Sequence, residues 1–62
     1  MNKQELQQDI LKLIQNEREL TLIFTNEFVN GKMNGKEYQN RLNQLFENTN
    51  SMIESKIERL GK

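Results

Sequence analysis

Residues 30–38 read NGKMNGKEY, and this stretch combines a stop signal for one helix with a start signal for the next. Gly31 follows a segment with helical spacing and can adopt the left-handed conformation that closes a helix. Asn34 can accept a hydrogen bond from a free amide in the first turn of a second helix. Glu37 stands where a capping box places its carboxylate, and Met33 holds the position of a hydrophobic staple. A connection of only about three or four residues predicts two antiparallel neighbouring helices.

The N-terminal residues repeat this start signal. Asn2 can cap a helix, and Glu5 stands at its third helical position, just before an apolar residue. We therefore expect one helix over about 3–30 and a second over about 35–60. The predicted fold is all-α: a single domain spanning residues 1–62, built as an antiparallel two-helix hairpin that dimerises into a four-helix bundle. The predicted turn and cap residues are Asn2, Glu5, Gly31, Met33, Asn34 and Glu37.

Apolar side chains recur at helical spacing along one face of each predicted helix. When the chain is folded about residue 32, two positions lie opposite each other if their residue numbers sum to about 63. With this pairing, the apolar residues of one helix lie opposite those of the other along most of their length. Glu17 and Thr49 interrupt the stripes near the middle. The predicted hairpin core comprises Leu6, Ile10, Leu13, Ile14, Leu20, Phe24, Phe28, Tyr38, Leu42, Leu45, Phe46, Met52, Ile53, Ile57 and Leu60.

A second set of apolar residues lies off this stripe. Leu11, Leu22 and Val29 are separated by intervals that place them on a different side of the first helix, and Ile23 lies off both sides. One partner helix cannot cover two apolar sides, so we expect these four residues and Glu17 to contact a partner or a second copy. Glu17 has two interpretations: a buried carboxylate that fixes register, or a carboxylate at the edge of the stripe that reaches water.

The short length of the chain also favours association. A chain of 62 residues usually needs a disulfide, a metal or a partner to be stable, and this one contains no Cys and no His. Self-association is the simplest remaining source of buried apolar surface. Residues 1–31 carry 3 basic and 5 acidic groups, whereas residues 32–62 carry 6 and 4, so the two halves have net charges of −2 and +2. The two predicted helices therefore have weakly complementary net charges.

The sequence offers little for catalysis or metal binding. Absence of His removes the commonest general base near neutral pH, and no nucleophile–base pair or phosphate-cradling loop is present. Glu5 with Asp9, and Glu54 with Glu58, are carboxylate pairs one helical turn apart, but solvated faces explain them better than a divalent cation does. We expect no enzyme activity, no metal and no cofactor. No apolar run approaches the ~20 residues of a membrane span, and no signal-peptide pattern opens the chain, which predicts a cytoplasmic protein.

From Leu20 to Phe46 the chain resembles the short bihelical modules of the SHOCT type. The resemblance is carried by the central residues Gly31, Met33, Asn34, Glu37 and Tyr38. It implies oligomerisation or protein contact. In length and layout the chain is also similar to Rop-type plasmid regulators, which are dimers of helical hairpins that bind paired RNA loops, although no residue motif carries that likeness and no RNA-binding residue is transferred from it.

These patterns predict a small non-catalytic regulatory or adaptor protein that acts through protein–protein contact by a self-associating hairpin. Its richness in Asn, Gln, Lys, Glu and Ile is typical of a bacterial or phage genome. The alternative is a helical bundle that binds nucleic acid, because a dimer doubles the basic groups on one face. The zero net charge of the chain and its scattered lysines and arginines suit a phosphate-binding surface poorly.

Overall fold

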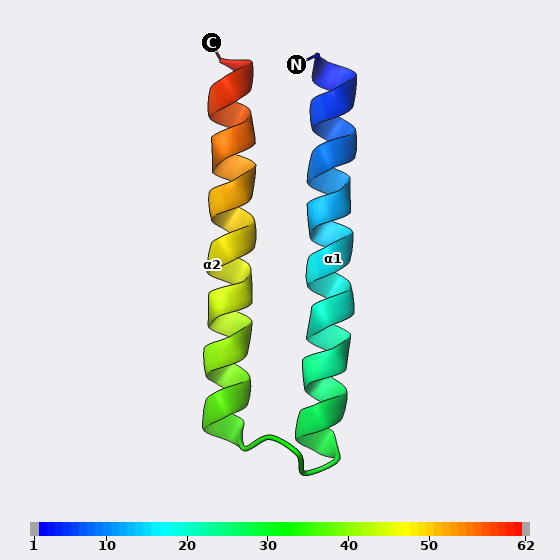
Figure 1. Cartoon of the computed structure of the whole chain (residues 1–62), viewed down its shortest axis with the longest axis vertical. Helices are drawn as coiled ribbons and strands as arrows, with labels where there is room; N and C mark the ends of the chain where they lie inside the picture. The colour runs from blue at the N-terminus through cyan, green and yellow to red at the C-terminus, as the bar shows by residue number, and fades with distance from the viewer. Residues whose placement is uncertain (1, 62) are drawn as a thin grey trace.

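The structure, a computed structural model, describes residues 2–61. Helix α1 (Lys3–Val29) and helix α2 (Gly35–Leu60) lie antiparallel and side by side, joined by a short connection (Figure 1). The start of α1 and the end of α2 therefore lie at the same end of the molecule. The all-α hairpin predicted from the sequence is confirmed, with helix bounds within one residue of those expected. The pair forms a flat rod with principal extents of 45 × 16 × 7 Å.

Both helices begin at an asparagine cap. The Oδ1 atom of Asn2 accepts a hydrogen bond from the amide of Glu5 at 2.8 Å, and Oδ1 of Asn34 accepts from the amide of Glu37 at 2.8 Å. Within residues 2–61 neither glutamate returns a side-chain hydrogen bond to its asparagine, so only the asparagine half of each predicted box forms. Met33, just before the second cap, is only 6% exposed, as expected of a staple residue.

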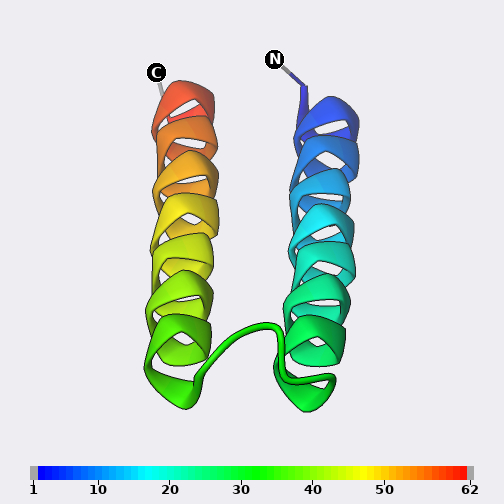
Figure 2. The same cartoon turned by 60° about the horizontal axis from the view of Figure 1, so that its bottom comes forward.

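The C-terminus of α1 ends in a Schellman motif. Gly31 has a φ of 78°, in the left-handed region that glycine adopts without steric cost. The Lys32 amide donates to the Glu27 carbonyl at 2.8 Å, and the Gly31 amide donates to the Phe28 carbonyl at 3.1 Å. Two carbonyls left without partners by the end of the helix are thereby satisfied, and the chain turns toward α2 (Figure 2).

The contact between the helices buries less of the predicted core than the stripes suggested. Leu6 is buried, and seven other core residues are half-buried. The remaining seven are exposed in the single hairpin, because two helices touch along one line and the flanks of each stripe stay in water. The half-buried set is Ile10, Leu13, Phe24, Tyr38, Leu42, Leu45 and Ile53. The exposed set is Ile14, Leu20, Phe28, Phe46, Met52, Ile57 and Leu60.

Polar pairs fix the register of the helices along this line. The hydroxyls of Thr25 and Tyr38 lie 2.7 Å apart near the turn, and Lys56 Nζ lies 3.2 Å from Asp9 Oδ2 toward the open end. The residue numbers of these pairs sum to 63 and 65, close to the predicted 63. Thr49 is buried, and its hydroxyl donates to the Leu45 carbonyl at 3.0 Å. The middle layer therefore accommodates a polar residue without leaving it unsatisfied.

Candidate functional site

The most prominent surface feature is uncovered apolar area. Only Leu6 and Met33 are buried among the apolar side chains of residues 2–61, whereas eleven large apolar side chains are exposed. Leu22 at 65% and Val29 at 74% are the two most exposed of these eleven side chains. Isolated exposed apolar residues are normal on protein surfaces, but contiguous ones indicate an interaction site. Whether these residues are contiguous depends on how the helices are rotated against each other.

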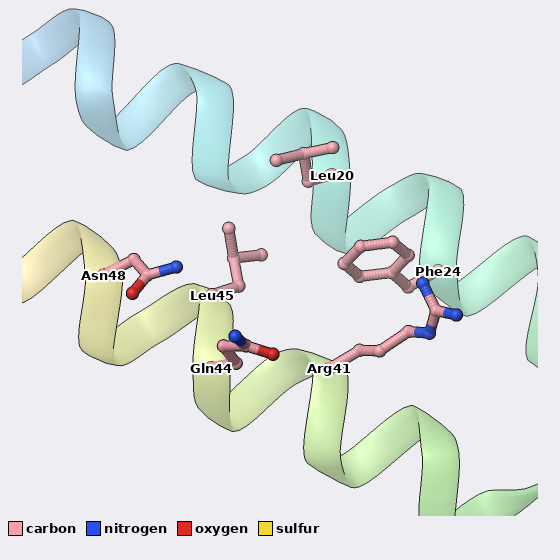
Figure 3. Close-up of a pocket in the computed structure, with 6 residues that line it drawn as sticks. All are labelled: Leu20, Phe24, Arg41, Gln44, Leu45 and Asn48. Carbon is pink, nitrogen blue, oxygen red and sulfur yellow. The ribbon is translucent and has the colours of Figure 1, made fainter.

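One broad face of the hairpin carries a groove along the line between the helices. Its turn-proximal hollow is lined by Leu20 and Phe24 of α1 and by Leu45 of α2, whose side chains converge from the two helices (Figure 3). Two further hollows continue it toward the open end, past Leu13 and Met52. We call this surface the Leu20 groove, with an apolar floor formed by Leu13, Leu20, Phe24, Leu45 and Met52.

Polar and basic side chains border the Leu20 groove. Asn16, Gln44 and Asn48 line its hollows, and the guanidinium carbon of Arg41 lies 5.8 Å from the centroid of the Phe24 ring. This is within the range of a cation–π contact. Arg59 lines the hollow nearest the open end. The groove thus combines apolar anchoring points with amide groups and positive charge.

The opposite face carries a second hollow, lined by Glu17, Arg18, Thr21 and Leu22 of α1 and by Phe46 of α2. Each residue of a helix is turned by about 100° from the one before it, so residues two apart point in nearly opposite directions. Phe46 therefore lies on the other side of α2 from Asn48, which borders the Leu20 groove. Helical spacing extends this surface along both helices. We call it the Phe46 face, with exposed apolar members Leu11, Ile14, Leu22, Phe46 and Ile57.

The structure divides the five predicted interface residues between these surfaces. Leu11 and Leu22 share the Phe46 face, and Val29 continues it toward the turn by helical spacing. Ile23 is 50% exposed and lines none of the hollows described above. Helical spacing from Leu20, three residues earlier, places it on the outer side of α1 next to the Leu20 groove. Glu17 is half-buried and lines hollows on both faces. The five residues therefore do not form one contact surface, and none of them belongs to the line between the helices except Glu17.

Apart from Glu17, the charged and polar members of both surfaces were not predicted from the sequence. In the sequence Arg18 and Arg41 look like two of many scattered basic residues, but in the structure each lies beside exposed apolar residues. The pairing of Asp9 with Lys56 follows from the register rule, but Asp9 was considered only as a neighbour of Glu5 on the same helix. A comparison of charged positions whose numbers sum to about 63 would have found it.

No group of three or more possible metal ligands converges anywhere within residues 2–61. Neither α1 nor α2 has a stretch that is both long and apolar enough to cross a membrane. No family model matches the chain, and no curated protein or solved structure matches it either. The surfaces described above therefore have to be interpreted from their own chemistry.

Proposed function

We propose that the chain is a non-catalytic interaction module, a cytoplasmic regulator or adaptor whose hairpin pairs with a second copy to form a four-helix bundle. The observation that carries this proposal is that, among residues 2–61, eleven large apolar side chains are exposed and only two apolar side chains are buried. A hairpin of this kind gains stability when a second one covers its apolar flank, because each buried apolar side chain contributes roughly 1.5–3 kcal/mol.

The Phe46 face is the surface assigned to the second copy. It presents apolar residues from both helices, as each half of a helical bundle must. A broad face of the rod measures 45 by 16 Å, a projected area close to the ~800 Å² that each partner buries in a standard interface. Four helices would then surround one core, and the exposed members of the predicted core on this side would be covered.

The Leu20 groove is the surface assigned to a protein partner. Dimerisation through the Phe46 face leaves it open, and its apolar floor suits the anchor residues of an amphipathic helix. Arg41 and Arg59 at its border favour a partner helix with acidic residues beside those anchors. The same two arginines support the competing proposal of nucleic-acid binding, which predicts a steep loss of binding as salt rises.

Sedimentation equilibrium of the full chain from low to high micromolar concentration tests the proposal. We expect a dimer for the native protein, a monomer for Leu22→Asp, and a dimer for the matched control Ile23→Asp. The two substitutions place the same charge at adjacent, exposed, large apolar positions, but only the first lies on the Phe46 face. Circular dichroism of each variant reports whether the helices persist.

A compact monomer at every concentration would contradict the proposal. An equal response to both substitutions would contradict the assignment of the Phe46 face while leaving self-association intact. Binding of a partner is tested separately, with Ile23→Asp expected to weaken it and Leu22→Asp expected to act only through the loss of the dimer.

A further inference from the structure

Two arrangements of the proposed dimer are possible once the Phe46 face is the contact. A twofold axis parallel to the helices places both turns at the same end and sets α1 against α2 of the partner subunit. A twofold axis across the helices places the turns at opposite ends and sets α1 against α1 of the partner subunit. Both bury the same face, so the choice depends on which side chains each arrangement brings together.

The heights of the charged residues along the rod distinguish the two. The Thr25–Tyr38 and Asp9–Lys56 pairs show that residues whose numbers sum to between 63 and 65 lie at about the same height on the two helices. Arg18 and Glu47 also sum to 65. Arg18 lines the hollow of the Phe46 face, and Glu47 is the exposed neighbour of Phe46 on the outer side of α2.

With the turns at the same end, rotation about the axis keeps every residue at its height. Arg18 then lies level with Glu47 of the partner subunit, at the border of the contact between α1 and the partner's α2, and the pair occurs twice. Apolar residues also come near one another, because Ile14 lies within about 3 Å, along the axis, of the height of the partner's Ile53, and Leu22 lies within about 5 Å of the height of the partner's Phe46.

With the turns at opposite ends, the contact between the two copies of α1 is antiparallel. Full overlap of a helix spanning Lys3–Val29 pairs positions whose numbers sum to about 32. Arg18 then lies beside Ile14 of the partner subunit and within about 6 Å, along the axis, of the height of the partner's Arg18. Glu47 and its counterpart lie on the other helix pair, so the two arginines approach each other with only the half-buried Glu17 of their own face as a nearby carboxylate. This juxtaposition of like charges disfavours a complex.

We infer that a second copy of this chain docks on the Phe46 face with its turn at the same end, so that Arg18 pairs with Glu47 of the partner subunit. This inference rests on the proposed function and specifies the geometry of the same dimer. It makes the bundle one in which every helix is antiparallel to both of its neighbours. The two Leu20 grooves, one on each hairpin, then lie on opposite outer faces of the four-helix bundle. Their turn-proximal hollows lie at the same end of the bundle.

Distance measurement between paired spin labels tests the geometry directly. The chain has no native Cys, so Lys32→Cys in the exposed turn carries a single label in each copy. We expect a label-to-label distance below half of the 45 Å length of the hairpin. A label at Glu19→Cys, near the middle of α1, is the control, because it gives a short distance in either arrangement and thus reports that the dimer is present.

Charge exchange provides the second measurement. We expect Arg18→Glu to raise the dimer dissociation constant about tenfold, since two exposed ion pairs become repulsive, and Glu47→Arg added to it to restore the native value. A distance near the full length of the hairpin at Lys32→Cys, together with a short one at Glu19→Cys, would overturn the inference and leave the proposed function standing. A protein that remains monomeric in both labelled forms would overturn both.

Discussion

The hydroxyl pair between α1 and α2 near the turn allows a quantitative test of how the helices are held. Thr25 Oγ1 donates to the Thr21 carbonyl at 2.7 Å, so its single proton is already engaged. Tyr38 must therefore donate its proton to Thr25 Oγ1, 2.7 Å away. The Tyr38 ring also stacks on Phe28, with centroids 4.7 Å apart and planes 3° from parallel. Tyr38→Phe removes the hydrogen bond and retains the stacked ring.

We expect Tyr38→Phe to lower the free energy of unfolding by about 1 kcal/mol, the net value of a typical hydrogen bond. Thr25→Val should cost roughly 1–2 kcal/mol, because it deprives the tyrosine hydroxyl of its acceptor in a part-buried position. Threonine and valine have similar helix propensities, so the helix itself contributes little to the difference. The double variant loses the shared bond only once, which predicts a coupling energy of about 1 kcal/mol.

Urea unfolding followed by far-ultraviolet circular dichroism measures these values. All variants must be compared at one protein concentration, because association shifts apparent stability. Thr21→Val is the matched control: it breaks a comparable bond, from the Thr21 hydroxyl to the Glu17 carbonyl at 2.7 Å, but does not touch the tyrosine hydroxyl. It should therefore be additive with Tyr38→Phe. A double variant of Thr25→Val and Tyr38→Phe that is equally additive would refute the hydrogen-bond network described here.

Three further predictions concern the turn, the caps and the open end. Gly31→Ala should cost about 1 kcal/mol in thermal melts because its φ is 78°, whereas Gly61→Ala, at a φ of −71°, should be neutral or slightly stabilising. Asn34→Ala should cost about 1 kcal/mol of unfolding free energy by removing the cap of α2, and Asn34→Asp should retain most of it. Lys56→Met should cost less than about 1 kcal/mol, because both partners of the Asp9 ion pair are partly solvated, and the loss should shrink further in high salt.

The parts of the fold that the sequence predicts well are those determined by local chemistry. Asn34 caps α2 and Gly31 adopts the left-handed conformation for reasons contained within a few neighbouring residues. The helix bounds follow directly from these signals. Burial cannot be predicted in this way. Ile53 and Ile57 hold equivalent places in the apolar stripe of α2, but Ile53 is half-buried in the structure whereas Ile57 is 52% exposed. That distinction depends on the rotation of one helix about its axis relative to the other.

The candidate surfaces were less predictable for the same reason. Leu22 and Ile23 are adjacent and equally apolar, and the sequence assigned both to a single interface. The structure separates them by placing Leu22 in one hollow with Phe46 and leaving Ile23 beside Leu20 on the other side. The relevant information is the pairing of α1 with α2, which is a tertiary property. The role of a charged residue such as Arg18 is harder still to predict. The sequence does not tell an arginine that borders an apolar surface from one that is simply exposed to water, because the difference depends on its neighbours on the other helix.

The difference between the two faces suits the two contacts proposed for them, one with a second copy and one with a protein partner. An apolar surface that serves the dimer must be covered permanently, which suits the Phe46 face with its mainly aliphatic and aromatic members. A surface that exchanges partners must remain stable in water when empty, which suits a groove bordered by Asn48, Gln44 and Arg41. Because Leu22 and Ile23 lie on different faces, single substitutions can remove one property and spare the other. We therefore predict that the proposed self-association and the proposed partner binding can be separated by mutation.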